Sequence, residues 1–175
     1  MSSIGEIRLH IKILSNPERF SVDDMINEMK SIYKNAANIE VRELSREFLN
    51  LPLLQDIDVG RCVRGETTEE QEELFRNRPD NADTTDVVVY FVRSTIPPLN
   101  GCAAHSVGRP GCVVTKYSSR FTVAHEVGHV LNLRHVLDSD RLMYGLGIDN
   151  ITNAPPNLIV TEIDTIKNSE SFKAI

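Results

Sequence analysis

The stretch that decides the fold is AHEVGHVLNLRHVLDSDRLMYG, residues 124–145. It holds three of the five histidines of the chain, His125, His129 and His135. On an α-helix, residues four apart lie one turn apart on the same face, so the first two imidazoles point the same way. Two such rings can bind one cation, and zinc accepts histidine nitrogens at about 2.0–2.1 Å. The spacing predicts a metal-binding helix from about Arg120 to Asn132.

The third histidine comes six residues after the second. A straight helix would carry His135 about 9 Å further along its axis, out of reach of the same ion. His135 returns only if the helix ends and the chain reverses, which requires a residue that tolerates a positive φ. Asn132 stands at this point, and asparagine tolerates the left-handed region better than most residues. We therefore expect three neutral imidazoles around one ion, with a fourth coordination position open.

Glu126 lies directly after the first of these histidines. On the helix it projects beside His129, where it can reach a water molecule at the metal without binding the metal itself. This is the His-Glu-x-x-His arrangement, in which the glutamate serves as general base. An incidental surface helix would leave Glu126, the bend residue and Met143 without a role.

The segment HEVGHVLNLRH, residues 125–135, resembles the long zinc signature of the metzincin metallopeptidases, which is followed by a methionine turn. Met143, eight residues after His135, matches that turn, and the wording LMYG is most similar to the matrixins (matrix metalloproteinases). The sequence departs from the signature at Asn132, where the family has glycine. The order of elements also resembles the family, although the sequence-specific match is confined to residues 122–145.

The resemblance implies a zinc-dependent endopeptidase with one catalytic Zn²⁺. Its ligands would be His125, His129 and His135, with Glu126 as general base and Met143 beneath the histidines as an apolar floor. Two other functions stay open at this point. One is a zinc-stabilised binding module that has lost catalysis, and the other is an effector or toxin domain.

The resemblance also implies where a substrate would bind. An extended protein or peptide would pair antiparallel with an edge strand near residues 101–107 and add one strand to the sheet. Residues 144–150 would wall the pocket for the side chain after the scissile bond. The candidate substrate-binding residues are Gly101, Cys102, Ala103, Ala104 and Tyr144.

Alternating hydrophobic periods divide the rest of the chain into strands and helices. The expected strands are 7–13, 39–44, 87–92, 102–107 and 112–117, and the expected helices are 21–36, 66–76, 120–132 and one from Thr161. The run VVVYFV is apolar at every position, which is typical of a central strand covered on both faces. The predicted class is α+β (α/β-like): a metzincin-type twisted mixed sheet with an antiparallel edge strand, two long helices including the zinc helix, and a small C-terminal subdomain ending in a helix.

We expect residues 1–175 to form a single catalytic domain, because their number suits one core. The resemblance divides it into an upper subdomain of about 1–132 and a lower one of about 133–175.

Three local predictions follow from the same patterns. Ser21 and Asp24 should cap the first helix, and Asp164 should occupy the capping position of the last. His10 lies on the polar face of the first strand and is expected at the surface. Methionines 25 and 29 continue the apolar face of the first helix and are expected in the core.

The three cysteines are too few for a disulfide scaffold. Cys102 and Cys112 lie ten residues apart around a Gly-Arg-Pro-Gly turn, so they could pair in an oxidising compartment. Cys62 would then be left over as a structural thiol. The alternative is that none of the three is paired.

Composition and charge exclude several partners. Nineteen basic and 25 acidic residues give a net charge of −6, which argues against nucleic acid as the main partner. The acidic run over 66–76 is expected to be a solvated face, because such charge runs usually are. A structural Ca²⁺ there is the alternative, but the pattern does not support it. No apolar run reaches the roughly 20 residues of a membrane span. Charged residues interrupt the N-terminal segment, so no signal peptide is expected. We expect a soluble monomer and leave its compartment open.

Overall fold

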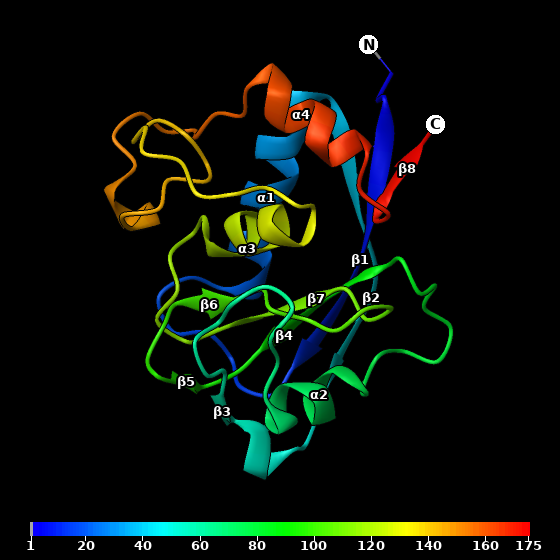
Figure 1. Cartoon of the computed structure of the whole chain (residues 1–175), viewed down its shortest axis with the longest axis vertical. Helices are drawn as coiled ribbons and strands as arrows, with labels where there is room; N and C mark the ends of the chain where they lie inside the picture. The colour runs from blue at the N-terminus through cyan, green and yellow to red at the C-terminus, as the bar shows by residue number, and fades with distance from the viewer. Residues whose placement is uncertain (1) are drawn as a thin grey trace.

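The computed structural model describes residues 2–175 and consists of a mixed sheet with helices on both faces (Figure 1). The main sheet has the strand order β2-β1-β4-β7-β6, and β8 pairs with β1 off this path. Its strands are β1 (Gly5–Ile13), β2 (Ile39–Phe48), β4 (Val87–Phe91), β6 (Gly101–Cys102), β7 (Gly111–Val114) and β8 (Phe172–Ala174). The pairs β1–β2, β1–β4 and β4–β7 are parallel, whereas β6–β7 and β1–β8 are antiparallel. The predicted mixed sheet with an antiparallel edge strand is confirmed.

The remaining elements are helices and a small second sheet. The helices are α1 (Val22–Ala37), α2 (Glu69–Phe75), α3 (Thr122–Val130) and α4 (Val160–Lys167), with 3₁₀ turns at Pro52–Leu54 and Ile148–Asn150. Strands β3 (Asp56–Asp58) and β5 (Ser94–Ile96) pair in parallel as a separate small sheet. The predicted long zinc helix thus spans nine residues, and β3, β5 and β8 had no counterpart in the sequence analysis. Within residues 2–175, no helix has the length and hydrophobicity to cross a membrane.

Two hydrophobic cores lie on opposite faces of the sheet, one packed by α1 and α3 and the other by α2 and β3. Strand β4 serves both cores, because its side chains alternate between the faces: Val87 and Val89 join the first core, and Val88 and Tyr90 the second. Every residue of β4 is buried, so the prediction of a central strand covered on both faces is confirmed.

The first helix has the predicted cap. The Ser21 hydroxyl accepts from the Asp24 N–H at 3.0 Å, and the Ser21 N–H donates to the Asp24 carboxylate. Met25 and Met29 are fully buried in the core, as expected.

The prediction for the last helix was wrong in its first turn. Helix α4 begins at Val160, and the Ile159 N–H donates to the Glu162 carboxylate at 3.1 Å. Because Ile159 is the N-cap, the capping position falls on Glu162 and not on Asp164. Glu162 is buried and is also bound by Arg141 at 2.7 Å.

The predicted paired strands near the edge of the sheet are shorter than expected. β6 ends at Cys102 and β7 ends at Val114. Beyond β7, the Thr115 N–H donates to the carbonyl of Asn100, the residue before β6, at 3.0 Å. Residues 103–110 form the connection between the two strands.

His10 is not at the surface, contrary to expectation. Its side chain is 2% exposed, with Nε2 2.9 Å from an Asp86 carboxylate oxygen and Nδ1 2.7 Å from the Ser45 hydroxyl. The segment leading into β4 covers this face of β1, and Arg78 holds that segment by donating to the carbonyls of Asp83 and Asp86.

The pairing of Cys102 with Cys112, which the sequence left open, does not form. Cys62 forms a disulfide with Cys102, at a Cα–Cα distance of 5.9 Å, and Cys112 is a buried free thiol. The register of the edge strands explains this outcome. Cys102 lies opposite Val113, so Cys112, the next residue along β7, points to the other face of the sheet.

Candidate metal centre

The helix that carries the first two histidines ends in a tight reversal. Asn132 has a φ of 74°, in the left-handed region. Its N–H donates to the carbonyl of His129, and the Leu133 N–H donates to that of Gly128, both at 3.0 Å. These two bonds form a Schellman motif, which satisfies carbonyls left free at the helix end. The reversal sends the following residues back along the helix.

The reversal brings three imidazoles together. Nε2 of His135 lies 3.3 Å from Nε2 of His125 and 3.0 Å from Nε2 of His129. One nitrogen from each ring lies within 4.8 Å of the others. Among residues 2–175, these three side chains are the group that is placed to hold a metal ion. Two nitrogens on a tetrahedral zinc ion would be about 3.3 Å apart, given Zn–N bonds of about 2.0–2.1 Å. The observed spacing is therefore close to that of a zinc site.

Backbone carbonyls fix the hydrogen positions on two of the rings. Nδ1 of His125 lies 2.8 Å from the carbonyl oxygen of Leu142, and Nδ1 of His129 lies 2.9 Å from that of Leu133. A carbonyl can only accept, so each Nδ1 carries the hydrogen and each Nε2 presents a lone pair. A neutral His135 can donate from Nε2 to one of these lone pairs but not to both. A cation at the centre would satisfy all three nitrogens, so the donor set fits a metal ion.

Burial favours the neutral form of His125 and His129, which is the state that binds a metal. Burial is the main reason that the pKa of His125 falls to about 4. Burial also lowers the pKa of His129, and the charges of His135 and Arg64 lower it further. His135 is exposed, so the centre is open to solvent on that side.

Glu126 lies against the edge strand. It is 8% exposed, and burial raises its pKa to about 8. A divalent ion nearby would favour the charged form and oppose this shift. A Cβ atom added at Gly101 would lie 2.8 Å from Cγ of Glu126 and 2.9 Å from the carbonyl oxygen of Val113. The glycine at this position therefore leaves room for the Glu126 side chain beside β6.

Met143 lies beneath the helix. It is fully buried, and a Cβ atom added at Gly128 would lie 2.6 Å from its sulfur. The Val136 N–H donates to the Met143 carbonyl, and the Gly145 N–H donates to the Val136 carbonyl, both at 2.9 Å. A glycine inside a helix is unfavourable by about 1 kcal/mol relative to alanine. A glycine at position 128 therefore indicates that another group packs closely against the helix there, and the Met143 sulfur is that group.

The candidate substrate-binding residues are divided between strand and loop. Gly101 and Cys102 form β6, the last strand at that edge of the sheet, and Ala103 and Ala104 follow it. Cys102 and Ala104 are buried in the core on the α2 side. Tyr144 is half-buried and forms a bridge with Val136 below the histidines. Their part in substrate binding stays a prediction.

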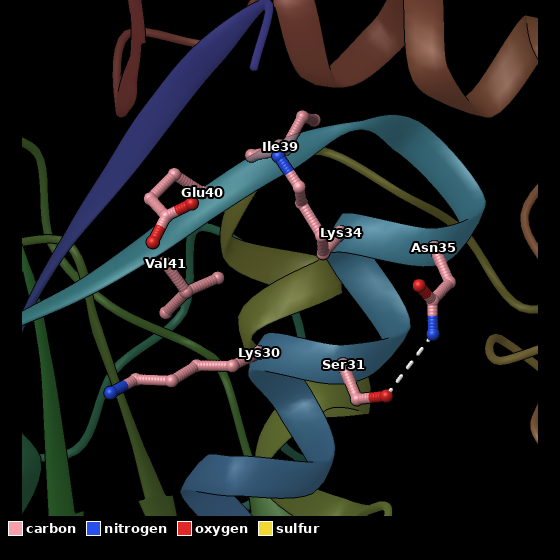
Figure 2. Close-up of a pocket in the computed structure, with 7 residues that line it drawn as sticks. All are labelled: Lys30, Ser31, Lys34, Asn35, Ile39, Glu40 and Val41. Atoms are coloured by element: carbon pink, nitrogen blue, oxygen red, sulfur yellow. Dashed lines mark hydrogen bonds between the residues drawn. The ribbon is translucent and has the colours of Figure 1, made fainter. Parts of the chain in front are cut away.

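A loop that the sequence analysis did not connect with this centre also reaches it. An Nη2 hydrogen of Arg64 is donated to the side-chain oxygen of Asn132. These residues are 68 positions apart, and no pattern in GRCVRG signals the contact. A pocket on the outer side of α1 and β2 (Figure 2), in contrast, contains none of the histidines. It is lined by Lys30, Ser31, Lys34, Asn35, Ile39, Glu40 and Val41.

Solved structures of zinc peptidases have the same fold. Metalloproteinase-II from Bacteroides fragilis superposes with a TM-score of 0.66 at 14% identity, over 94% of this chain and 53% of that protein, so this chain spans about half of its length. The archaemetzincin of Methanopyrus kandleri gives a TM-score of 0.56 at 13% identity, over 93% of this chain and 94% of that one. A zinc-dependent peptidase from Methanocorpusculum labreanum gives 0.57 at 13% identity, over 90% and 99%.

At these identities the likeness shows the fold alone. This chain has a zinc metallopeptidase fold, as the sequence predicted. The likeness does not support the matrixin subgroup, for which the wording LMYG was the sole sign. No protein-family model matches the chain, and no curated protein sequence does.

Proposed function

We propose that this protein is a zinc-dependent endopeptidase of metzincin type, with His125, His129 and His135 as metal ligands. The observation that carries the proposal is the convergence of three Nε2 atoms, two of them fixed as lone-pair donors by backbone carbonyls. Met143 supports the site from below as an apolar floor, and the left-handed Asn132 forms the helix bend.

When bound, zinc supplies Lewis-acid activation of a water molecule and of the peptide carbonyl. Glu126 then serves as general base and accepts a proton from the attacking water. The water oxygen bonds to the carbonyl carbon, the C–N bond breaks, and Glu126 returns the proton to the leaving amine. The missing side chain at Gly101 leaves room for the Glu126 side chain beside β6.

The substrate would bind as an extended strand along β6. This strand lies at the end of the sheet, so its outer edge offers backbone donors and acceptors to a peptide. Tyr144 and the residues after it would border the pocket for the side chain that follows the scissile bond.

The test is hydrolysis of a mixed peptide library by the zinc-loaded wild type and by Glu126→Ala. Loss of a general base lowers the rate by about 10²–10⁴-fold, so the variant should be nearly inactive while its zinc content stays unchanged. Glu73→Ala, an exposed glutamate on α2, is the matched control and should cleave like the wild type. Equal background cleavage by all three proteins would refute the endopeptidase and favour a zinc-stabilised binding module or an effector domain without proteolysis.

A further inference from the structure

The loop between β3 and α2 reaches the bend of the metal-binding segment. In Figure 1 this loop rises in front of the sheet toward α3. Arg64, which belongs to this loop, donates to the side chain of Asn132. Asn132 lies between the second and third histidines, and its own N–H donates to the carbonyl of His129. The guanidinium therefore lies beside the candidate metal centre, at the point where the chain reverses.

The loop is held at several points. The disulfide from Cys62 ties it to Cys102 in the edge strand β6. Arg61 forms an ion pair with Glu66 at 2.8 Å across the loop. Backbone bonds close two turns, from the Cys62 N–H to Val59 and from the Glu66 N–H to Val63. Arg64 is thus carried by a braced loop that joins the predicted substrate strand to the helix bend.

The charge of Arg64 is not balanced by the protein. The ion pairs within residues 2–175 do not include Arg64, and its one side-chain hydrogen bond there goes to a neutral amide oxygen. A guanidinium has five N–H groups and forms its strongest bonds with carboxylates, often two at a time. Arg64 is also exposed, in a chain with a net charge of −6. It therefore has donors left for an anionic ligand that approaches the centre.

We propose that Arg64 is a specificity-determining residue that binds a carboxylate of the substrate near the scissile bond. The carboxylate comes either from an acidic side chain or from the free C-terminus of a short peptide. This inference rests on the proposed endopeptidase function and names its substrate class.

The experiment uses two series of peptides with the zinc-loaded protein. In one series, each position beside the cleavage site carries Glu or Gln; in the other, the same peptide ends in a free acid or an amide. We expect the wild type to prefer the charged member of one series by about tenfold or more in kcat/KM, mainly through KM, because a hydrogen bond between charged groups is stronger than a neutral one. Dependence on Glu identifies the side chain as the source, and dependence on the free acid identifies the C-terminus.

Variants of the loop separate charge from shape. Arg64→Gln keeps a donor for Asn132 but removes the charge, so the preference should fall to nearly one, whereas Arg64→Lys should keep part of it. Arg61→Gln, on the same loop, should retain the wild-type preference. Equilibrium binding of both series to zinc-loaded Glu126→Gln gives a readout that does not depend on turnover. We expect the Glu126→Gln protein to bind the charged peptides more tightly than the neutral ones. The double variant Glu126→Gln with Arg64→Gln should lose this preference.

Three results would overturn the inference: no preference in either series, an unchanged preference in Arg64→Gln, or an equal loss in Arg61→Gln. The last would show that the loop shape, and not the charge of Arg64, selects the substrate. Failure of the proposed function looks different. In that case the wild type cleaves neither series, while the binding preference of the Glu126→Gln protein still depends on Arg64.

Discussion

Two buried histidine centres in this molecule have opposite hydrogen-bonding patterns. His10 is 2% exposed and His125 is 5% exposed. The two nitrogens of His10 lie against Asp86 and Ser45, so the protein satisfies the whole ring. The ring of His125 is satisfied at Nδ1 by a backbone carbonyl, and its Nε2 faces other histidine nitrogens.

The difference shows what separates a structural histidine from a candidate ligand. His10 and His125 are alike in burial, so burial does not identify a function. The informative feature is a lone pair that the protein has oriented but not used. At the metal centre two carbonyls orient such lone pairs toward one point, and at His10 none is left.

The largest expected effect is a loss of zinc affinity when one histidine of the cluster is removed. His135→Ala removes one of three ligands, and we expect zinc affinity to fall by more than about a hundredfold, beyond the loss caused by changing an outer-shell partner. Competition with a chelator measures this affinity. His105→Ala, a histidine outside the cluster, should bind zinc like the wild type. Unchanged zinc binding by His135→Ala would remove the basis of the comparison.

At His10 we expect a substitution to change the stability of the protein and not its zinc affinity. His10→Ala leaves the Asp86 carboxylate buried without its main partner, so the free energy of unfolding should fall by about 3 kcal/mol. Urea denaturation of the zinc-free protein measures it. Zinc affinity should not change, and His10→Ala with Asp86→Ala should recover part of the stability. A loss of zinc affinity in His10→Ala would mean that the two centres are coupled.

The pH dependence of stability sharpens the contrast further. In the zinc-free protein Glu126 has a pKa of about 8, above its ordinary value of 4.5, so the folded state holds this proton more tightly. Its contribution to stability is complete below pH 4.5 and is lost as the pH rises through 8. Between pH 5 and 8 the wild type should lose about 3.5 kcal/mol relative to Glu126→Gln. His125 is present in both proteins, so its titration cancels in this difference. Parallel profiles of the two proteins would contradict the prediction.

The smallest expected effect is a difference in stability between two variants of Asn132, the residue at the helix bend. Asn132→Gly should be more stable than Asn132→Ala by about 1 kcal/mol, because alanine tolerates a φ of 74° poorly. Both variants lose the contact with Arg64, so that loss cancels. Thermal denaturation of the two proteins measures the difference, and equal stabilities would show that the bend is not strained.

The convergence of the three histidines could be predicted from the sequence because the parts of the cluster are local. The three histidines lie within eleven residues, and helix geometry together with one left-handed asparagine determines their approach. The network of His10 could not be predicted, since its partners are 35 and 76 residues away. Their approach depends on how the loop before β4 packs over β1.

The disulfide could not be predicted from the sequence for a related reason. The faces on which they lie depend on the register of β6 against β7, and a shift of one residue reverses the answer. Arg64 is the extreme case, because an exposed side chain in a loop has no periodicity from which to infer a partner.

The bond between Cys62 and Cys102 has a consequence for the proposed role of Arg64 in substrate selection. Thiol-rich compartments such as the cytosol reduce disulfides. The disulfide does not involve the three histidines. It ties the loop that carries Arg64 to strand β6, because Cys62 belongs to that loop. We therefore expect a reductant to leave turnover in place and to blunt selectivity.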